Sequence, residues 1–320
     1  MKFIRNTSTD PYYNMSLDEY CLEQYPSDET FFYLWRNKPS VIVGLNQNVY
    51  AEVNLSYLEQ KGISLARRVT GGGAVYHDLQ NLNYTIVGKS PDPSIFAQAL
   101  KKLGLDVELT GRNDIFAEGK KISGYARRVW RDREMIHGTL MYDVDIDTLT
   151  QVLDVPGSKL QAKGIASVRS RVANVKDLLP SFASLDELQA ALQEILSDGD
   201  GELEFTERMK AEVRKTADEK FSSWDWIYGH SHRVDFRSGA KLACGRVEFG
   251  FALDRGRIVD VAVTGDFIGS APPDLVCDAL KGARYEKDEL LARLRAADVN
   301  SCFPGVSAEE LTDMIFNQHI

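Results

Sequence analysis

Three consecutive glycines, Gly71–Gly73, are the first feature of this sequence that could serve chemistry. They follow Arg68 and Thr70 and precede His77 and Asp78. Glycine has no Cβ atom, so its backbone N–H groups can approach a ligand closely, and a cationic side chain beside them favours an anion. The segment therefore predicts a site for a phosphate or a long, narrow acyl chain, although a triple glycine alone most often marks a turn or a bulge.

A second group of polar residues occurs in GRND, KKISG and HGTL, between positions 111 and 140. A lysine on a strand can reach a carboxylate or an α-phosphate, and Asn-Asp can support a metal-bound nucleotide. Each residue also has an ordinary explanation, since a lone lysine is usually solvated and Asn-Asp commonly makes a turn. Only their grouping on adjacent predicted strands indicates a site. The candidates are Asn113, Asp114, Lys121, Arg128, His137 and Thr139.

The elements that must position these residues follow from the local pattern. The β-branched and aromatic runs at 31–35 and 41–46 predict two strands that pair across RNKPS, and Ser16 and Glu19 have capping-box spacing for a helix near 15–25. SLARRV leads into the glycines as a strand and NLNYTIVG leaves them as another. The glycine run thus joins two strands, whereas a P-loop or a dinucleotide-binding fingerprint lies between a strand and a helix.

The remaining pattern predicts a mixed α/β domain followed by a small α+β domain. A tight turn at Glu118-Gly119 indicates a hairpin, and SDGDGE at 197–202 an exposed loop. Helical periodicity occurs at 53–62, 93–104, 184–196 and 206–221. From about residue 233 three strands precede three amphipathic helices: HRVDF, KLACGRVEFGFAL and RIVDVAVTGDF, then PPDLVCDALKG, KDELLARLRAA and SAEELTDMIF. We expect domains at 1–232 and 233–320.

Composition narrows the class of protein. The chain has 320 residues, 43% of them hydrophobic, which is enough for a full core. Its net charge of -9 disfavours a nucleic-acid partner, because phosphate binding needs a basic surface. Without an apolar run that suits a signal peptide or a membrane span, we expect a cytoplasmic protein without a membrane partner. Its four scattered cysteines suggest neither a disulfide framework nor a zinc site.

Taken together, the motifs resemble the lipoate-protein ligases of the biotin/lipoate attachment-enzyme superfamily. RRVTGGGAVYHDLQNLNY, GRNDI, KISG and HGTLMYDVDI carry the resemblance in this order, with NMSLDEY, GLNQNVYAEVN, KGIASVRSRVANV and WDWIYG extending it over most of the chain. The family implies a mixed-sheet α/β catalytic domain with a small C-terminal α+β accessory domain. One departure is Gln80, where relatives commonly have glycine; glutamine is strained there if the position needs a positive φ.

The resemblance implies a two-step, ATP-dependent reaction with Mg²⁺. Lipoate and ATP give lipoyl-AMP and pyrophosphate, and a lysine of an apo acceptor, an E2 lipoyl domain or the glycine-cleavage H protein, then takes the lipoyl group. By analogy Lys121 is catalytic and contacts the carboxyl and the α-phosphate, and Asp114 is the candidate Mg²⁺ ligand. The implied lipoate-binding residues are Arg68, Thr70, Gly71, Gly72, Gly73, Arg128 and His137. The implied nucleotide-binding residues are Ala74, Val75, Tyr76, His77, Asn81, Asn113, Asp114, Lys121 and Thr139.

Three alternatives share this fold. A lipoyl or octanoyl amidotransferase needs a nucleophilic cysteine in its catalytic domain, and there is none between Asp145 and Asn174. A noncatalytic lipoate- or nucleotide-binding protein would not need Lys121 with GRND. Biotin ligation is disfavoured because RRVTGGG is of the lipoate type. ATP dependence and the acyl group transferred would separate these functions.

Overall fold

The computed structural model divides the chain into two compact units. The residues it describes are 1–110, 113–153, 171–229, 236–254 and 256–317. The larger unit contains Met1–Ile42, Ala51–Arg67 and Ala74–Ile227. The second contains Val43–Tyr50, Arg68–Gly73 and Tyr228–Ile320. The glycine run therefore groups with the C-terminal part of the chain.

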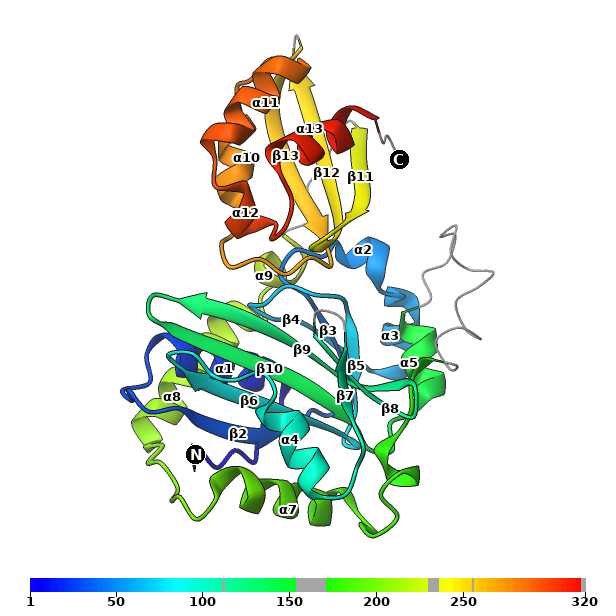
Figure 1. Ribbon diagram of the computed structural model, residues 1–320, viewed down its shortest axis with the longest axis vertical. Helices are drawn as coiled ribbons and strands as arrows, with labels where there is room; N and C mark the ends of the chain where they lie inside the picture. The colour runs from blue at the N-terminus through cyan, green and yellow to red at the C-terminus, as the bar shows by residue number, and fades with distance from the viewer. Residues whose placement is uncertain (111–112, 154–170, 230–235, 255, 318–320) are drawn as a thin grey trace. The chain divides into compact units, whose positions relative to one another are not determined.

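A mixed, seven-stranded sheet forms the centre of the larger unit (Figure 1). Only the β1–β2 pair is parallel, and the other neighbours are antiparallel. In spatial order the strands are β1 (Lys2–Phe3), β2 (Phe31–Trp35), β6 (Asn81–Gly88), β10 (Arg133–Met141), β9 (Lys120–Trp130), β8 (Asp114–Ala117) and β7 (Glu108–Thr110). The predicted hairpin at Glu118-Gly119 is confirmed, with both residues at positive φ between β8 and β9.

A separate three-stranded sheet has the order β4-β3-β5, from Ser64–Arg67, Ser40–Val43 and Val75–His77. The predicted pairing of the strands at 31–35 and 41–46 is wrong, because β2 and β3 belong to different sheets. Every residue of both strands is buried. Such runs have no polar side to reveal which neighbour they pair with, so the local pattern contains no information on register.

Helices cover both faces of the large sheet (Figure 1). α4 (Ile95–Lys102) and α7 (Leu185–Ser197) lie on one face, and their apolar residues join one core with β6 and β10. α1 (Pro11–Glu23) contacts β6 and β10 from the other face and packs on α8 (Glu207–Thr216). The remaining elements are α2 (Val49–Glu52), α3 (Leu55–Lys61), α5 (Ile146–Val152), η1 (Val175–Asp177), the π-helical η2 (Ala217–Phe221) and α9 (Trp224–Tyr228).

The start of α1 differs from the prediction. Asp10 is its N-cap and accepts from the Tyr12 backbone, and Pro11 occupies the first turn, where its missing N–H costs nothing. Ser16 lies inside the helix, where its buried hydroxyl donates to the Val213 carbonyl. The capping-box interpretation of Ser16 and Glu19 is therefore wrong, because a local spacing cannot reveal a hydrogen bond to a distant helix.

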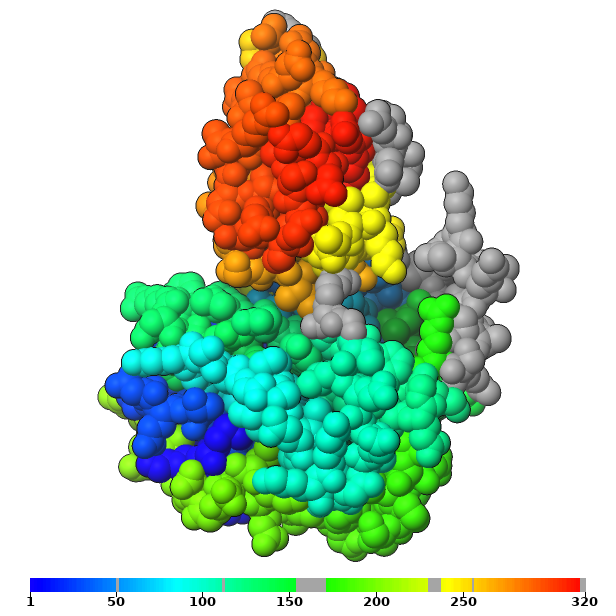
Figure 2. All heavy atoms as spheres, viewed as in Figure 1, coloured from blue at the N-terminus to red at the C-terminus, as the bar shows by residue number. Residues whose placement is uncertain are grey.

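The C-terminal unit is an antiparallel sheet covered by helices on one face (Figure 1). The strands are β11 (Phe236–Leu242), β12 (Gly245–Asp254) and β13 (Arg257–Gly265), and the helices are α10 (Asp274–Leu280), α11 (Lys287–Ala296), α12 (Val299–Cys302) and α13 (Ala308–Asn317). Figure 2 shows the helices as the orange and red side of this unit. Apolar residues of the strands and helices form one core. The three predicted helices are present; α12 was not predicted, and most of HRVDF lies outside the described residues.

The four cysteines are buried and unbridged. Burial raises the pKa of the Cys21 thiol far above its ordinary value, that of Cys277 to about 12 and that of Cys302 to about 11. A thiol must ionise to act as a nucleophile, so these thiols are unreactive near neutral pH. Among the described residues, no helix combines the length and the apolar composition that a membrane crossing requires.

Candidate active site

The large sheet brings several predicted site residues to one face. Thr85 pairs with His137, Asn83 with Thr139, and Asp114 with Gly124. Cross-strand partners point to the same face and neighbours along a strand to opposite faces, so these residues share the face that α1 covers. We call it the polar face; it carries Asn81, Asn83, Thr85, Asp114, Gly124, Arg128, His137 and Thr139.

Lys121 reaches the polar face through an irregularity in the β8–β9 register between Ile115 and Phe116. Its ammonium Nζ lies 2.7 Å from Asp114 Oδ1, and the two side chains are 38% and 31% exposed. A Cβ added at Gly124 would lie only 2.9 Å from this Nζ. The missing side chain at Gly124 therefore makes room for a half-exposed, oriented cation, which can receive a carboxylate or a phosphate.

Asn113 fixes the beginning of β8 against β9. Its backbone carbonyl accepts from the Tyr125 N–H at 2.9 Å, and its Nδ2 donates to the Tyr125 carbonyl. These bonds hold the next residue, Asp114, in place at the beginning of β8. Asn113 thus supports the Lys121–Asp114 pair by its hydrogen bonds.

His137 belongs to a buried hydrogen-bonded cluster centred on Asp18 of α1. Its Nδ1 lies 2.6 Å from Asp18 Oδ2, while Asp18 Oδ1 accepts from the hydroxyls of Tyr33 and Thr85 at 2.5 and 2.8 Å. Thr85 also accepts from the Trp35 indole at 3.0 Å. A carboxylate that is 1% exposed is stable only with such donors. The cluster holds the imidazole of His137 in place on the polar face.

The residues after the glycine run lie on the small sheet. β5 pairs with β3, with Tyr76 opposite Val41 and His77 opposite Ser40. His77 Nδ1 lies 3.1 Å from Asn37 Nδ2, and the side-chain oxygen Oδ1 of Asn37 accepts from Asn14 Nδ2 at 2.7 Å. Burial is the main cause that raises the pKa of Tyr76. Ala74 and Val75 are half-buried. The nucleotide roles predicted for residues 74–77 are not tested by this arrangement.

Arg128 lies beside two acidic residues of α1. Its guanidinium is 3.0 Å from Glu23 and 3.8 Å from Glu19, and it lies over the Trp130 ring, 5.6 Å from the centroid. Burial and the neighbouring Glu19 raise the pKa of Glu23. The ligand role predicted for Arg128 is neither supported nor contradicted by these contacts.

The glycine run has a different structural reason at each position. Within the second unit, a Cβ at Gly71 would meet the Phe267 carbonyl oxygen at 2.3 Å. Gly72 has φ +95°, which side-chain-bearing residues rarely adopt. A Cβ at Gly73 would meet nothing within 4 Å. Packing explains the first glycine and backbone conformation the second, whereas Gly73 has open space beside it.

Arg68 braces the glycine loop from inside the second unit. Its buried guanidinium donates to Thr70 Oγ1 at 3.0 Å, to the Gly71 carbonyl at 2.7 Å and to the Gly73 carbonyl at 2.9 Å. The neighbouring Arg67 points elsewhere and belongs to the larger unit, where it donates to the carbonyls of Trp226 and Ile227. Its burial lowers its pKa to about 10. These bonds connect the RR dipeptide to the WDWIYG motif.

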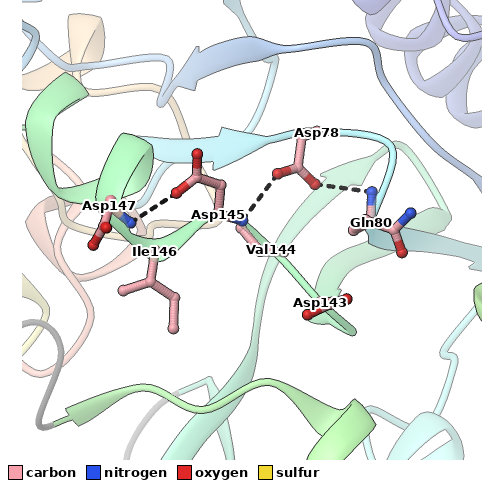
Figure 3. Close-up of a pocket in the computed structure, with 7 residues that line it drawn as sticks. All are labelled: Asp78, Gln80, Asp143, Val144, Asp145, Ile146 and Asp147. Carbon is pink, nitrogen blue, oxygen red and sulfur yellow. Dashed lines mark hydrogen bonds between the residues drawn. The ribbon is translucent and has the colours of Figure 1, made fainter.

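A pocket of about 600 Å³ in the larger unit contains none of the predicted site residues (Figure 3). Asp78 Oδ1 and Oδ2 accept from the backbones of Gln80 and Asp145 at 2.8 and 3.1 Å, and Asp145 caps α5. Local backbone bonds thus account for two of the acidic residues of the pocket, and a third, Asp143, is paired with Lys176. Gln80 does not have a positive φ, so its position does not need glycine.

Several residues of the polar face were not predicted from the sequence. Asp18, Tyr33, Asn83 and Thr85 are buried polar residues there, and Asn37 lies behind His77. The available signal was polar residues at alternate positions of otherwise apolar strands, as in NLNYT, together with an aspartate inside the apolar part of a helix.

The fold and the polar face define an α/β protein with an oriented lysine, and comparison with known proteins assigns its family. Residues 10–197 match the family described as lipoyl protein ligase A/B catalytic domain, and residues 231–315 match the bacterial lipoate protein ligase C-terminus. Lipoate-protein ligase LplJ of Bacillus subtilis is 34% identical over 99% of this chain and 100% of the relative. Lipoate-protein ligase 1 of Staphylococcus aureus is 35% identical, over 97% and 98%.

Solved structures of similar fold carry related names. Plasmodium falciparum LipL1 in complex with lipoate has a TM-score of 0.78 at 23% identity and covers 93% of this chain and 95% of its own; it bears on the fold alone. The bipartite lipoate protein ligase and E2 lipoyl domain of Thermoplasma acidophilum gives 0.63 at 32%, over 73% and 97%. A lipoate-protein ligase A bound with ATP gives 0.61 at 32%, over 71% and 98%. The chain belongs to the lipoate-protein ligase family, which is a family of enzymes.

Proposed function

We propose that this protein is an ATP-dependent lipoate-protein ligase. Lipoate attacks the α-phosphate of ATP through its carboxylate, giving lipoyl-AMP and pyrophosphate. The ε-amine of an acceptor lysine then attacks the acyl carbon, an amide forms, and AMP and a proton leave. The observation that carries the proposal is the Lys121–Asp114 pair at 2.7 Å on the polar face of a lipoate-protein ligase fold.

The physical basis of the first step is electrostatic. A carboxylate is a poor electrophile, and ATP supplies the leaving group, so the protein needs a fixed positive charge where negative charge collects. The Lys121 ammonium is half-exposed and is oriented by Asp114 beside the open space at Gly124. Lys121 therefore contacts the lipoate carboxyl and the α-phosphate in this proposal.

The described residues also offer a ligand for Mg²⁺. Mg²⁺ bound with nucleotides usually takes one or two carboxylates, and phosphates and water complete its coordination. Asp114 is a half-buried carboxylate next to Lys121, which fits that demand, and it would hold the ion. Bound Mg²⁺ would neutralise phosphate charge during the attack. In the part of the chain that the structure describes, no group of three or more His, Cys, Asp and Glu side chains is placed so that it could hold a metal ion by itself.

The other predicted residues keep their proposed roles. Arg128 and His137 line the lipoate site, and Asn81, Asn113 and residues 74–77 line the nucleotide site. Thr139 also belongs to the nucleotide site in this proposal, at its junction with the acyl chain. In the second unit, Arg68 braces a loop in which Gly73 has open space for a ligand. We retain domain boundaries at 1–232 and 233–320, and a cytoplasmic location stays a prediction.

The names of similar proteins support the substrates proposed here. One related structure, a protein from Thermoplasma acidophilum that is 30% identical, is described with bound lipoic acid. Another is described as bound with ATP, and a third pairs a ligase with its E2 lipoyl domain. We infer that this chain uses lipoate and ATP and acts on apo lipoyl domains of E2 subunits or on the glycine-cleavage H protein. The amidotransferase alternative has no support, because the described thiols of Cys21, Cys277 and Cys302 have raised pKa values.

One reaction tests the proposal. Purified protein is incubated with isotope-labelled lipoate, ATP, Mg²⁺ and an apo lipoyl domain, and the acceptor mass is measured. We expect addition of one lipoyl group that requires ATP. Transfer from a lipoyl-carrier protein without ATP would instead establish an amidotransferase, and tight lipoate binding without transfer would establish a binding protein.

A further inference from the structure

Asn83 has an unusual position among the buried polar residues of the polar face. It is 1% exposed, and its side-chain carbonyl accepts from Asn81 Nδ2 at 3.0 Å. Its own Nδ2 is buried and has no hydrogen-bond partner within the described ranges. A buried donor without a partner is uncommon in folded proteins and lowers the stability of the fold. A ligand atom that accepts a hydrogen bond would satisfy this donor.

The strand register relates Asn83 to Lys121. Asn83 of β6 is opposite Thr139 of β10. The β10–β9 register places Gly138 opposite Tyr125, and by strand geometry the next residues, Thr139 and Gly124, continue the row. The absent side chain of Gly124 accommodates the Lys121 ammonium. Neighbouring strands are about 4.8 Å apart, so two spacings place Asn83 about 10 Å from the lysine end of the row. On its other side Asn83 is opposite Trp35.

This separation matches the substrate proposed above. An extended chain advances about 1.2 Å per bond, so an eight-carbon acyl group with its carboxyl at Lys121 reaches about 8 Å along the row. Its far end then lies beside Asn83. In lipoate this end carries the two dithiolane sulfurs, whereas in octanoate it carries only hydrogen.

We propose that Asn83 is a specificity-determining residue whose amide N–H donates to a dithiolane sulfur and selects lipoate over octanoate; this inference rests on the ligase function proposed above. Divalent sulfur is a weak acceptor, so it satisfies the donor partly. An unsubstituted chain offers no acceptor and leaves the donor unpaired. The cost of that unpaired donor corresponds to about tenfold in the ratio of kcat/KM for the two acids.

Two nearly isosteric substitutions separate the donor from the shape of the side chain. Asn83→Thr keeps a hydroxyl donor and Asn83→Val replaces it with a methyl group, and both are β-branched and suited to a strand. Ser123→Ala is the control, because Ser123 is a buried polar residue of β9 opposite Ile115 on the apolar core side of the same sheet. For each protein, kcat/KM is measured with lipoate and with octanoate by ATP-dependent pyrophosphate release.

We expect the lipoate-to-octanoate ratio to fall about tenfold in Asn83→Val and to stay within about threefold of the wild type in Asn83→Thr and Ser123→Ala. Equal ratios for Asn83→Val and Asn83→Thr would overturn the inference, as would a wild-type ratio at or below one. Lack of activation of either acid by the wild type would instead refute the ligase function. Calorimetric titration with each acid in the absence of ATP gives the same comparison if a variant is inactive.

Discussion

The two faces of the seven-stranded sheet are built from the same strands but contain different chemistry. On the side of α4 and α7, Leu82, Tyr84, Ile136 and Leu140 join one apolar core. On the side of α1, several of the alternate residues of these strands are polar, among them Asn83, His137 and Thr139. The comparison shows that the apolar face stabilises the fold, whereas the polar face holds groups that a closed apolar core would exclude.

Buried polar groups are tolerated on the polar face because most of them are hydrogen-bonded. Asp18 compensates for its burial with three partners, and Asn81 donates to the side-chain oxygen of Asn83. Lys121 differs from them in being half-exposed, with its cation directed by one carboxylate. We therefore expect substitutions on the polar face to affect activity and those on the apolar face to affect stability.

The largest expected effect on activity is that of Lys121→Ala. Removal of a preorganised charged donor typically costs about 10²- to 10³-fold in rate, so adenylate formation should fall at least that far. The melting temperature should change little, because the side chain is 38% exposed. Lys120→Ala, at the exposed neighbouring position, is the matched control. Near-normal turnover of Lys121→Ala would remove this lysine from the mechanism.

Ile136→Ala tests the apolar face, where we expect a loss of stability with little change in activity. Ile136 is 1% exposed within the core, and its truncation should lower the free energy of unfolding by about 2–5 kcal/mol, because it leaves a cavity. Chemical denaturation provides the measurement. The kcat/KM of the folded fraction should stay near that of the wild type; a hundredfold loss without destabilisation would contradict the division between the faces.

Gly124→Ala should produce a smaller loss of activity. The added methyl would lie 2.9 Å from Lys121 Nζ and 3.3 Å from Asp114 Oδ1, so the ammonium must move. Misplacement of a catalytic group by about 1 Å can cost about 100-fold, and we expect a decrease of about 10- to 100-fold in kcat/KM. Gly201→Ala adds a methyl group in open space and serves as the control. Equal activities of the two variants would show that the space at Gly124 is unimportant.

The smallest effect on activity is expected from alkylation of the cysteines, which have no role in the proposed reaction. Iodoacetamide should modify the native protein very slowly at pH 7.5, because all four thiols are buried. Intact-mass spectrometry follows the reaction, and treatment in denaturant should label all four. Rapid loss of ligase activity after one equivalent of iodoacetamide would contradict the claim that the thiols are unreactive and take no part in the reaction.

Local patterns predicted most of the elements, and long-range contacts explain what they missed. α7 with its Ser184 cap and the β8–β9 hairpin were readable because their signals lie within a few residues. The separation of β2 from β3 was not, since both strands are buried on both faces. The Asp18–His137 contact joins positions 119 residues apart, which periodicity cannot reveal.

The site was predictable to a similar degree. Family resemblance named Lys121 and Asp114, but the register irregularity that brings them to 2.7 Å depends on pairing between strands. The glycine run was expected to expose a bare backbone, and only Gly73 has open space on the side where a Cβ would project. Packing and conformation account for Gly71 and Gly72, and neither can be inferred from the sequence alone.

The central claim, that an oriented ammonium on the polar face assists the joining of lipoate to AMP, is tested most directly by trapping the intermediate. The wild type is mixed with lipoate, ATP and Mg²⁺ without an acceptor, quenched in acid and analysed by mass spectrometry. We predict about one equivalent of lipoyl-AMP per protein, formed with pyrophosphate, and far slower formation in Lys121→Ala. Acceptor lipoylation without any lipoyl-AMP, or an equal yield at an equal rate in Lys121→Ala, would contradict the account.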